Sequence, residues 1–261
     1  MRAARAAAAD DDDDDKTGKA ALLRASTGAT EAGTALETTG SEIDFSYRFE
    51  ANKELGPHCR VCVNTDTSKF EHLAVPLKGE HQAHNCALAL AVLDKLKAHG
   101  FHFEEQALIR GLAATDLPGR MEFVHDKPRV LIDGAHNSAS IAALIKSLGA
   151  HVQYDSLVMV FGCGQDKDID GMLEQVALGA DKIIFTRAGD NPRAMSPGEL
   201  QRRYESLTGK MAQTSAGLKD ALNMAARAVG RDDLILVTGS FYLAGEAKRL
   251  LAEKRRAAAA T

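Results

Sequence analysis

Residues 130–255 alternate between short apolar segments and amphipathic stretches, and this alternation restricts the possible folds more than any other feature. The apolar segments are VLIDGA, SLVMVFGCG, KIIFTRA and DLILVTGS. Each is followed by apolar residues at helical spacing, and one further helix, GLKDALNMAARAV, precedes the last segment. Strands that are apolar throughout are typical of parallel sheets with helices on both faces. The pattern predicts a doubly wound, mostly parallel α/β domain.

Residues 41–116 have a different pattern of residue types. Three segments rich in β-branched and aromatic residues, IDFSYRF, CRVCVNT and FEHLAVPL, are separated by turn-forming residues and predict a small antiparallel meander. GEHQAHNCALALAVLDKLKAHG and FEEQALIRGLAAT then predict two helices. The first helix is expected to bury an apolar stripe made of Ala87, Leu88, Val92, Leu93 and Leu96. The break LPGR, residues 117–120, marks the expected boundary between residues 41–116 and the α/β domain at 117–255.

Residues 1–40 are blocks of Ala, Asp, Thr and Gly with few large apolar side chains. A segment of this composition is expected to be a disordered or loosely attached tail. Its acidic run contains DDDDK, the form of a protease-cleavage tag, and a native acidic tail is an equal alternative. Neither origin enters the fold argument.

Composition argues against two classes of partner. The net charge of −4, the 5% aromatic content and the lack of Trp leave neither a broad basic face nor many stacking platforms, so we expect no nucleic-acid partner. No apolar run approaches the roughly 18 residues that span a bilayer, and the N-terminus lacks a signal-peptide core. We therefore expect a cytoplasmic protein that binds small molecules.

Cysteine and histidine spacing gives no complete metal site. Cys59 and Cys62 form a C-x-x-C pair, but it lies in an expected strand, where residues three apart point to opposite faces. His81 and His84 share one face of the following helix without a third ligand at suitable spacing. We expect reduced thiols and no metal site.

A group of polar residues follows the apolar segment VLI at residues 133–137, DGAHN. Open α/β sheets bind ligands in the crevice beyond the carboxyl ends of their strands, so Asp133, His136 and Asn137 are candidate ligand contacts. Asp133 could accept hydrogen bonds from a ribose. A simpler interpretation is that Asn137 or Ser138 caps the next helix, and both can hold together.

Arg120 follows a Pro-Gly turn at the expected domain boundary. A guanidinium in this position can reach across a cleft to phosphate oxygens, although a surface pair with Glu122 would look the same in the sequence. Lys167 lies between two acids in FGCGQDKD, and a salt-bridged loop is the favoured interpretation there. The phosphate loop G-x-x-x-x-G-K-[ST] does not occur in the sequence.

Six motifs occur in a familiar order: GEHQAHNCALALAVLDKL, LPGRMEF, VLIDGAHNSASIAAL, FGCGQDKDIDGML, TRAGDNPRAMSPGEL and VTGSFYLAGE. Together, over about residues 43–252, they resemble the folylpolyglutamate synthase/dihydrofolate synthase family of the Mur ligase superfamily. The resemblance implies that 117–255 is a Rossmann-like ligase domain and that 41–116 is the end of a central ATPase domain. DGAHN favours the folate branch over the cell-wall ligases.

The resemblance also implies a chemistry and a set of residues. The family joins glutamate to a folate or dihydropteroate carboxylate that ATP has activated as an acyl phosphate, with magnesium as cofactor. Asn85 would contact adenine, Arg120 the phosphates and Asp133 the ribose, while His136 would line the same cleft. Ser138 stands where the family usually has Pro, and this changes little because Ser is also favoured at helix starts.

The main departure from the family is the missing phosphate loop, together with the magnesium ligands and modified lysine that accompany it. The resemblance therefore predicts a C-terminal portion that is inactive alone and whose missing P-loop domain is a partner. Self-association through apolar surface in 41–116 would also be expected. A Mur-type peptide ligase portion and a non-catalytic nucleotide-binding module remain as alternatives.

Overall fold

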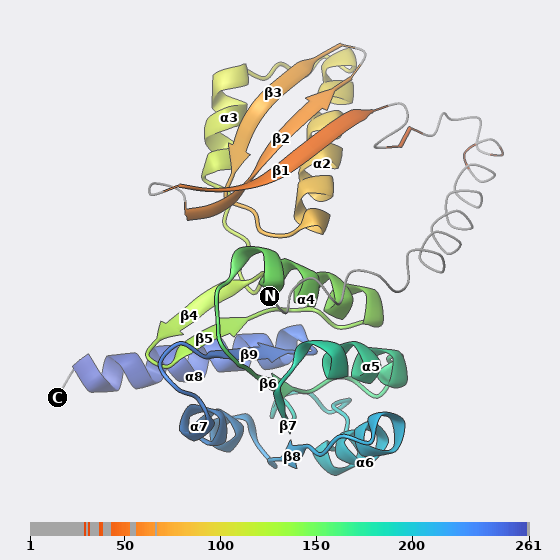
Figure 1. Ribbon diagram of the computed structural model, residues 1–261. Helices are drawn as coiled ribbons and strands as arrows, with labels where there is room; N and C mark the ends of the chain where they lie inside the picture. The colour runs from red at the N-terminus through yellow and green to blue at the C-terminus, as the bar shows by residue number, and fades with distance from the viewer. Residues whose placement is uncertain are drawn as a thin grey trace. The chain divides into compact units, whose positions relative to one another are not determined.

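A computed structural model of the chain describes residues 43–52, 56–65 and 67–259, together with positions 29, 31, 37 and 38 (Figure 1). The expectations for residues 1–40 fall almost entirely outside this part. The chain divides into two compact units. The first contains His81–Thr115 and the described residues of Met1–Leu77, and the second contains Lys78–Glu80 and Asp116–Thr261.

The first unit is a three-stranded antiparallel meander with two helices. Its strands, in the order β1-β2-β3, are β1 (Asp44–Asn52), β2 (Gly56–Asn64) and β3 (Lys69–Val75). The helices are α2 (Glu80–Ala98), whose first residue groups with the second unit, and α3 (Glu105–Ala113). The meander is an element that the sequence predicted.

The predicted apolar stripe of α2 is wrong at two of its five positions. Leu88 and Val92 are 53% and 52% exposed. The residues that α2 buries are smaller on average and also include polar side chains: Gln82, Ala83, Cys86, Ala87, Leu90, Ala91 and Asp94. The error arose because large apolar residues lie all around this helix, whereas burial followed the small residues that let a helix approach its neighbours closely.

Asp94 anchors the turn between β2 and β3 to α2. Its carboxylate, only 3% exposed, accepts hydrogen bonds from the hydroxyls of Thr65 (2.5 Å), Thr67 (2.6 Å) and Ser68. The Lys97 ammonium lies 3.3 Å away. Burial by itself would raise the pKa of the Asp94 carboxyl, but the hydroxyl donors and Lys97 outweigh burial, so that this pKa lies well below its usual value.

The second unit is a six-stranded sheet of order β4-β5-β9-β6-β7-β8, in which only β4 is antiparallel to its neighbour. Its elements in chain order are β4 (Glu122–Asp126), β5 (Arg129–Ile132), α4 (Ser138–His151), β6 (Leu157–Phe161), α5 (Ile169–Gly179), β7 (Lys182–Phe185), α6 (Pro197–Thr208), β8 (Gln213–Thr214), α7 (Leu218–Ala228), β9 (Leu234–Thr238) and α8 (Phe241–Ala259).

Helices cover both faces of this sheet (Figure 1). Leu157, Met159 and Phe161 point from β6 into a core shared with α4, α5 and α6. Val158 and Val160 point the other way, into a core shared with α7 and α8. All five residues of β6 are buried, as expected for a central parallel strand.

The predicted doubly wound α/β fold is therefore confirmed, with a small antiparallel sheet before it. Strands β4 and β8 were not predicted, since β4 is half-exposed and β8 has only two residues. Over the described residues, no helix is both long enough and apolar enough to cross a membrane.

Replacing Asp94 tests its anchoring role. Because the folded-state pKa is lowered, the carboxylate stabilises the fold above the usual carboxyl pKa of 3.8, and this stability is lost as pH falls below that value. Asp94→Asn should lower the free energy of unfolding by about 1–3 kcal/mol at pH 7 and by less at pH 3, measured by urea denaturation. The exposed Asp116→Asn is the matched control, and an equal loss at both pH values would contradict this account.

Candidate active site

Three loops meet at the carboxyl ends of β5 and β9. They are the turn before β4, the DGAHN loop after β5 and the segment between β9 and α8. The Gly134 amide donates to the Gly119 carbonyl (2.8 Å), and the Gly239 amide donates to the Ala135 carbonyl (3.0 Å). Three of the residues predicted from the sequence, Arg120, Asp133 and His136, lie on these loops. The carboxyl edge of a parallel sheet is where α/β proteins bind ligands.

Asp133 connects two of these loops. Its carboxylate is 4% exposed and accepts the backbone N–H groups of Met121 (2.9 Å) and Ala135 (2.8 Å). Met121 has a left-handed backbone, with φ of 43°, which is unusual for a residue other than glycine. The carboxylate thus stabilises the turn that carries Arg120. Its contact with a ribose stays a prediction.

The Arg120 side chain is not paired with Glu122. Its guanidinium lies over the Phe241 ring, 4.6 Å from the ring centre, and makes no hydrogen bond or ion pair with any described side chain. Glu122 instead pairs with Lys248 (2.7 Å) and accepts the Gly119 amide (2.9 Å). A half-buried cation that pairs with no described anion is available to bind an anionic ligand.

His136 is oriented by its own loop. Its Nδ1 lies 2.9 Å from the Gly134 carbonyl oxygen, which can only accept, so Nδ1 carries the proton and Nε2 is left for other contacts. Asn137 caps α4, because its side chain accepts the Ser140 amide (2.8 Å) in a capping box. The capping interpretation is therefore confirmed for Asn137. It does not conflict with a ligand role of the same loop.

Two other candidates do not belong to these three loops. Asn85 belongs to α2 in the first unit, where its amide donates to Gln82 (3.3 Å). Lys167 pairs with Asp166 (3.4 Å), which agrees with the salt-bridged interpretation. Within the described ranges, no three His, Cys, Asp or Glu side chains are grouped as metal ligands would be. The four cysteines are unpaired thiols.

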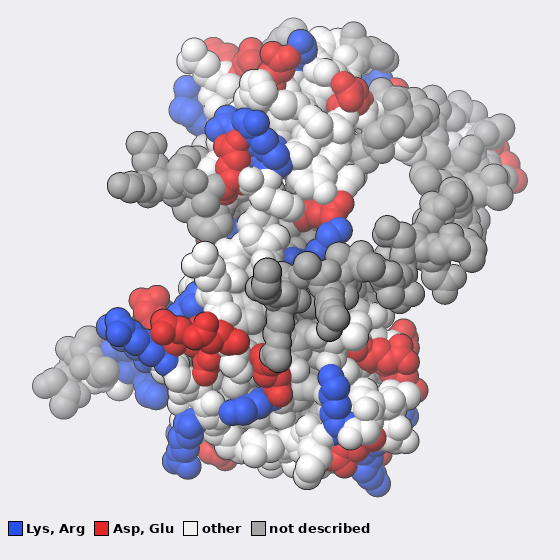
Figure 2. Space-filling model, viewed as in Figure 1, with Lys and Arg blue, Asp and Glu red and all other residues white. Residues whose placement is uncertain are grey.

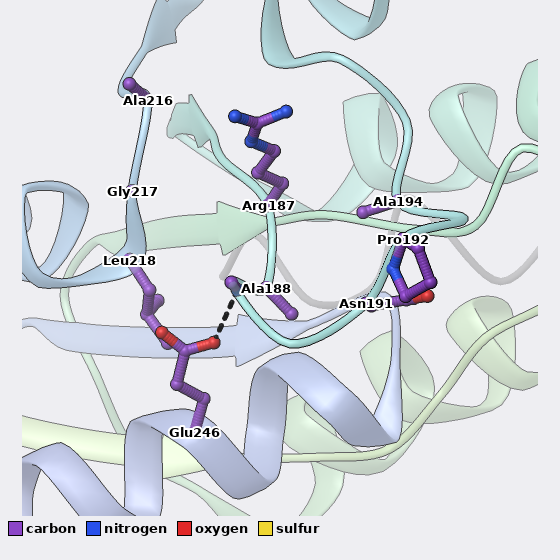
Figure 3. A pocket seen from close by; sticks show the side chains of 10 residues that line it. Arg187, Ala188, Asn191, Pro192, Ala194, Ala216, Gly217, Leu218 and Glu246 are labelled. Atoms are coloured by element: carbon purple, nitrogen blue, oxygen red, sulfur yellow. Dashed lines mark hydrogen bonds between the residues drawn. The ribbon is translucent and has the colours of Figure 1, made fainter.

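A pocket of about 320 Å³ opens at the same sheet edge, beyond β7 (Figure 3). It is lined by the loop from Arg187 to Ala194, by the start of α7 at Gly217 and by Glu246 of α8. Gly217, the N-cap of α7, lines the pocket and has no side chain to cap the first N–H groups of that helix.

The charged side chains of this pocket have opposite signs. Arg187 extends between the segment at Ala216 and the one at Ala194, and it makes no ion pair or hydrogen bond with a described side chain (Figure 3). Glu246 enters from α8 and accepts the Gly189 amide (2.8 Å). Elsewhere on the face shown in Figure 2, acidic and basic side chains are interspersed over the described residues. A zwitterionic ligand would complement Arg187 and Glu246 together.

Comparison with known proteins connects these loops to a family. Residues 119–241 match the Mur ligase family, glutamate ligase domain. A dihydrofolate synthase/folylpolyglutamate synthase of Mycobacterium tuberculosis is 33% identical over 199 residues, 69% of this chain and 40% of the relative. The chain belongs to the folylpolyglutamate synthase/dihydrofolate synthase family. A ligase of Vibrio vulnificus, UDP-N-acetylmuramoyl-L-alanyl-D-glutamate--2,6-diaminopimelate ligase, is 34% identical over 64% of this chain and 34% of its own length.

A solved structure of this family extends the match to the first unit. Folylpolyglutamate synthase of Mycobacterium tuberculosis, complexed with ADP, aligns with a TM-score of 0.79 and 29% identity over 88% of this chain and 52% of that one. The chain thus spans about half of that structure's length, and less of the two sequence relatives. The predicted family is confirmed.

Sequence reasoning missed Phe241, Arg187 and Glu246. Two of the six motifs, TRAGDNPRAMSPGEL and VTGSFYLAGE, contain them, but no residue in either had been assigned a role. Arg187 could have been found, because it closely follows a buried strand. Glu246 could not, because it lies on a helix and reaches the pocket only after that helix has packed.

Asp133→Asn tests the connection between the loops. The amide can accept only one of the two N–H groups and presents a donor to the other, so the free energy of unfolding should fall by about 1–3 kcal/mol, measured by urea denaturation. Arg120→Ala is the control, and its effect should be smaller because, among the described side chains, the guanidinium contacts Phe241 alone. Equal stability of the wild type and Asp133→Asn would show that the carboxylate does not hold the loops.

Proposed function

We propose that this chain forms the nucleotide-facing and glutamate-facing half of an ATP-dependent folate glutamate ligase in the cytoplasm. The observation that carries this proposal is the Arg120 guanidinium, which has no ion-pair partner among the described residues and lies at the carboxyl edge of the sheet inside the segment that matches the glutamate ligase domain. In such a ligase the folate carboxylate attacks the terminal phosphate of ATP and releases ADP. The glutamate amine then attacks the acyl phosphate and releases phosphate.

Four residues of this half would act on the nucleotide. Arg120 would neutralise phosphate charge, since a guanidinium can bind two phosphate oxygens at once. Asp133 would face the ribose while it holds the Arg120 turn, and His136 would present Nε2 to the same space. Asn85, on α2, is proposed for the adenine. A nucleotide role agrees with the ADP complex of the similar ligase.

The pocket beyond β7 is proposed to hold the incoming glutamate. Glutamate carries two carboxylates and one ammonium group. The Arg187 guanidinium and the α7 N-terminus can receive carboxylates, while Glu246 can receive the ammonium. Helix α8 carries both Phe241 and Glu246, which lie five residues or about 7.5 Å apart along its axis, so one helix connects the two proposed subsites.

The described residues do not fit a magnesium site, because they hold no cluster of suitable ligands. We therefore assign the magnesium ligands and the phosphate loop to a P-loop domain that would act as partner. Without positioned phosphate donors, phosphoryl transfer loses most of its stabilisation. The chain alone is accordingly proposed to be inactive, and folate glutamylation by the pure chain would contradict this.

Two rivals remain testable. A Mur-type peptide ligase would use a muramyl peptide in place of the folate, and the diaminopimelate ligase relative makes it the stronger rival. When the P-loop half is added, protection from thermal unfolding by a folate rather than by a muramyl peptide separates the two. A non-catalytic module would bind nucleotide but gain no ligase activity from that addition.

Nucleotide binding is the first test. Calorimetric titration of the isolated chain with ATP and magnesium should give saturable binding that Arg120→Ala weakens about tenfold or more, because a charge-assisted contact is lost. Asp133→Ala should weaken binding as well. Arg202→Ala, on α6, removes an exposed cation elsewhere and should leave affinity unchanged. If the wild type binds no ATP, the nucleotide site forms only in the assembled enzyme. If all variants bind ATP with the same affinity, the nucleotide binds at another place on the chain.

Glutamate binding tests the pocket separately. In an NMR titration, L-glutamate should shift amide resonances around Gly189 and Gly217, and Arg187→Ala should weaken this binding about tenfold. Glutamine, whose side chain is neutral, should bind the wild type more weakly than glutamate does. Arg187→Ala should bind glutamine and glutamate with equal affinity. If the two ligands bind the wild type with the same affinity, Arg187 does not receive a carboxylate.

A further inference from the structure

Phe241 lies at the centre of the three loops. It is the first residue of α8 and is 44% exposed, so its ring is not simply buried in the core. The ring lies 4.6 Å from the Arg120 guanidinium and 5.9 Å from the centre of the His136 ring. One aromatic side chain therefore touches two of the residues proposed to act on the nucleotide.

The Phe241 ring packs closely against the backbone at Gly134 and Gly119. A Cβ atom on Gly134 would collide with the ring, because three ring carbons lie within 2.5 Å of the place it would take. A Cβ on Gly119 would lie 3.7 Å from the ring edge, in ordinary contact. The glycine of DGAHN is thus explained by the close approach of the ring, and the ring rests on the loop that follows β5.

The ring is also the one described side-chain partner of Arg120. An arginine side chain has several rotatable bonds and would otherwise sample many directions. A guanidinium over an aromatic face is attracted by the negative charge of that face. The contact leaves the N–H groups at the guanidinium edge available for phosphate oxygens, whereas an ion pair with Glu122 would have occupied them.

We propose that Phe241 is a positioning residue that holds the Arg120 guanidinium in the direction from which it binds the nucleotide phosphates. The inference rests on the proposed nucleotide role of Arg120. It predicts that an aromatic face at position 241 is required and that an apolar side chain of similar size does not replace it.

The experiment is a double-mutant cycle with ADP as the probe, measured by calorimetry on the full chain. Phe241→Leu keeps an apolar side chain over Gly134 but removes the aromatic face, and it should weaken ADP binding about fivefold. Phe241→Tyr should restore wild-type affinity. The double variant Phe241→Leu/Arg120→Ala should bind no more weakly than Arg120→Ala alone, because Phe241 acts through Arg120.

Phe123→Leu is the matched control. Phe123 is 39% exposed and also lies under cations, with Lys78 and Arg129 each 5.6 Å from its ring centre. Its loss removes comparable contacts away from Arg120 and should leave ADP affinity unchanged. Unchanged affinity in Phe241→Leu, or additive losses in the double variant, would overturn the inference while leaving the nucleotide role of Arg120 standing.

A spectroscopic measurement separates this inference from the proposed function. In the chain without ligand, the ring should shift the Arg120 side-chain NMR resonances upfield. Phe241→Leu should abolish that shift and Phe241→Tyr should retain it. If the wild-type chain binds no ADP, the nucleotide role fails for the isolated chain, and these resonances decide the inference: a shift lost in Phe241→Leu supports it, and no change overturns it.

Discussion

The Asp133 carboxylate is nearly inaccessible to solvent and receives N–H groups from two loops that are separate in sequence. Burying an ionised carboxylate is unfavourable unless hydrogen bonds replace the lost water, and here two backbone amides do so. The interaction fixes the turn before β4 against the loop after β5. The directions of Arg120 and His136 depend on it, because both residues lie on the loops that it joins.

Helix α8 makes the second connection in this unit. Phe241 begins the helix and rests on Gly134, and Glu246, within the next two turns, holds the loop after β7 through the Gly189 amide. The two proposed subsites thus share one rigid element packed against the sheet through Leu243, Ala244 and Ala247. Sites carried by packed helices and strand ends keep their geometry better than sites built on loops alone.

The first unit is held together by different interactions. Its strands bury apolar side chains such as Val61, Val63 and Val75. A polar anchor, Asp94 with its three hydroxyl donors, joins the turn between β2 and β3 to α2. Leu88 and Val92 remain exposed on the same helix. Apolar side chains at this exposure fit the expected self-association or partner binding of this segment, which stays a prediction.

The resemblance to the family placed Arg120 in one cleft with Asp133 and His136. The residue patterns by themselves determined the α/β class, the antiparallel meander, a helix cap at Asn137 or Ser138, and the position of Asp133 and His136 after a buried strand. These features follow from local periodicity and from the rule that parallel strands end together. Only the tertiary structure decided that Asp133 is buried against backbone amides, that Arg120 lies over Phe241 rather than beside Glu122, and that Glu246 enters a pocket beyond β7. Each of these depends on contacts between segments distant in sequence, for which no local pattern exists. The prediction of the buried face of α2 was wrong for the same reason. The surface against which an apolar helix packs decides which of its sides is buried.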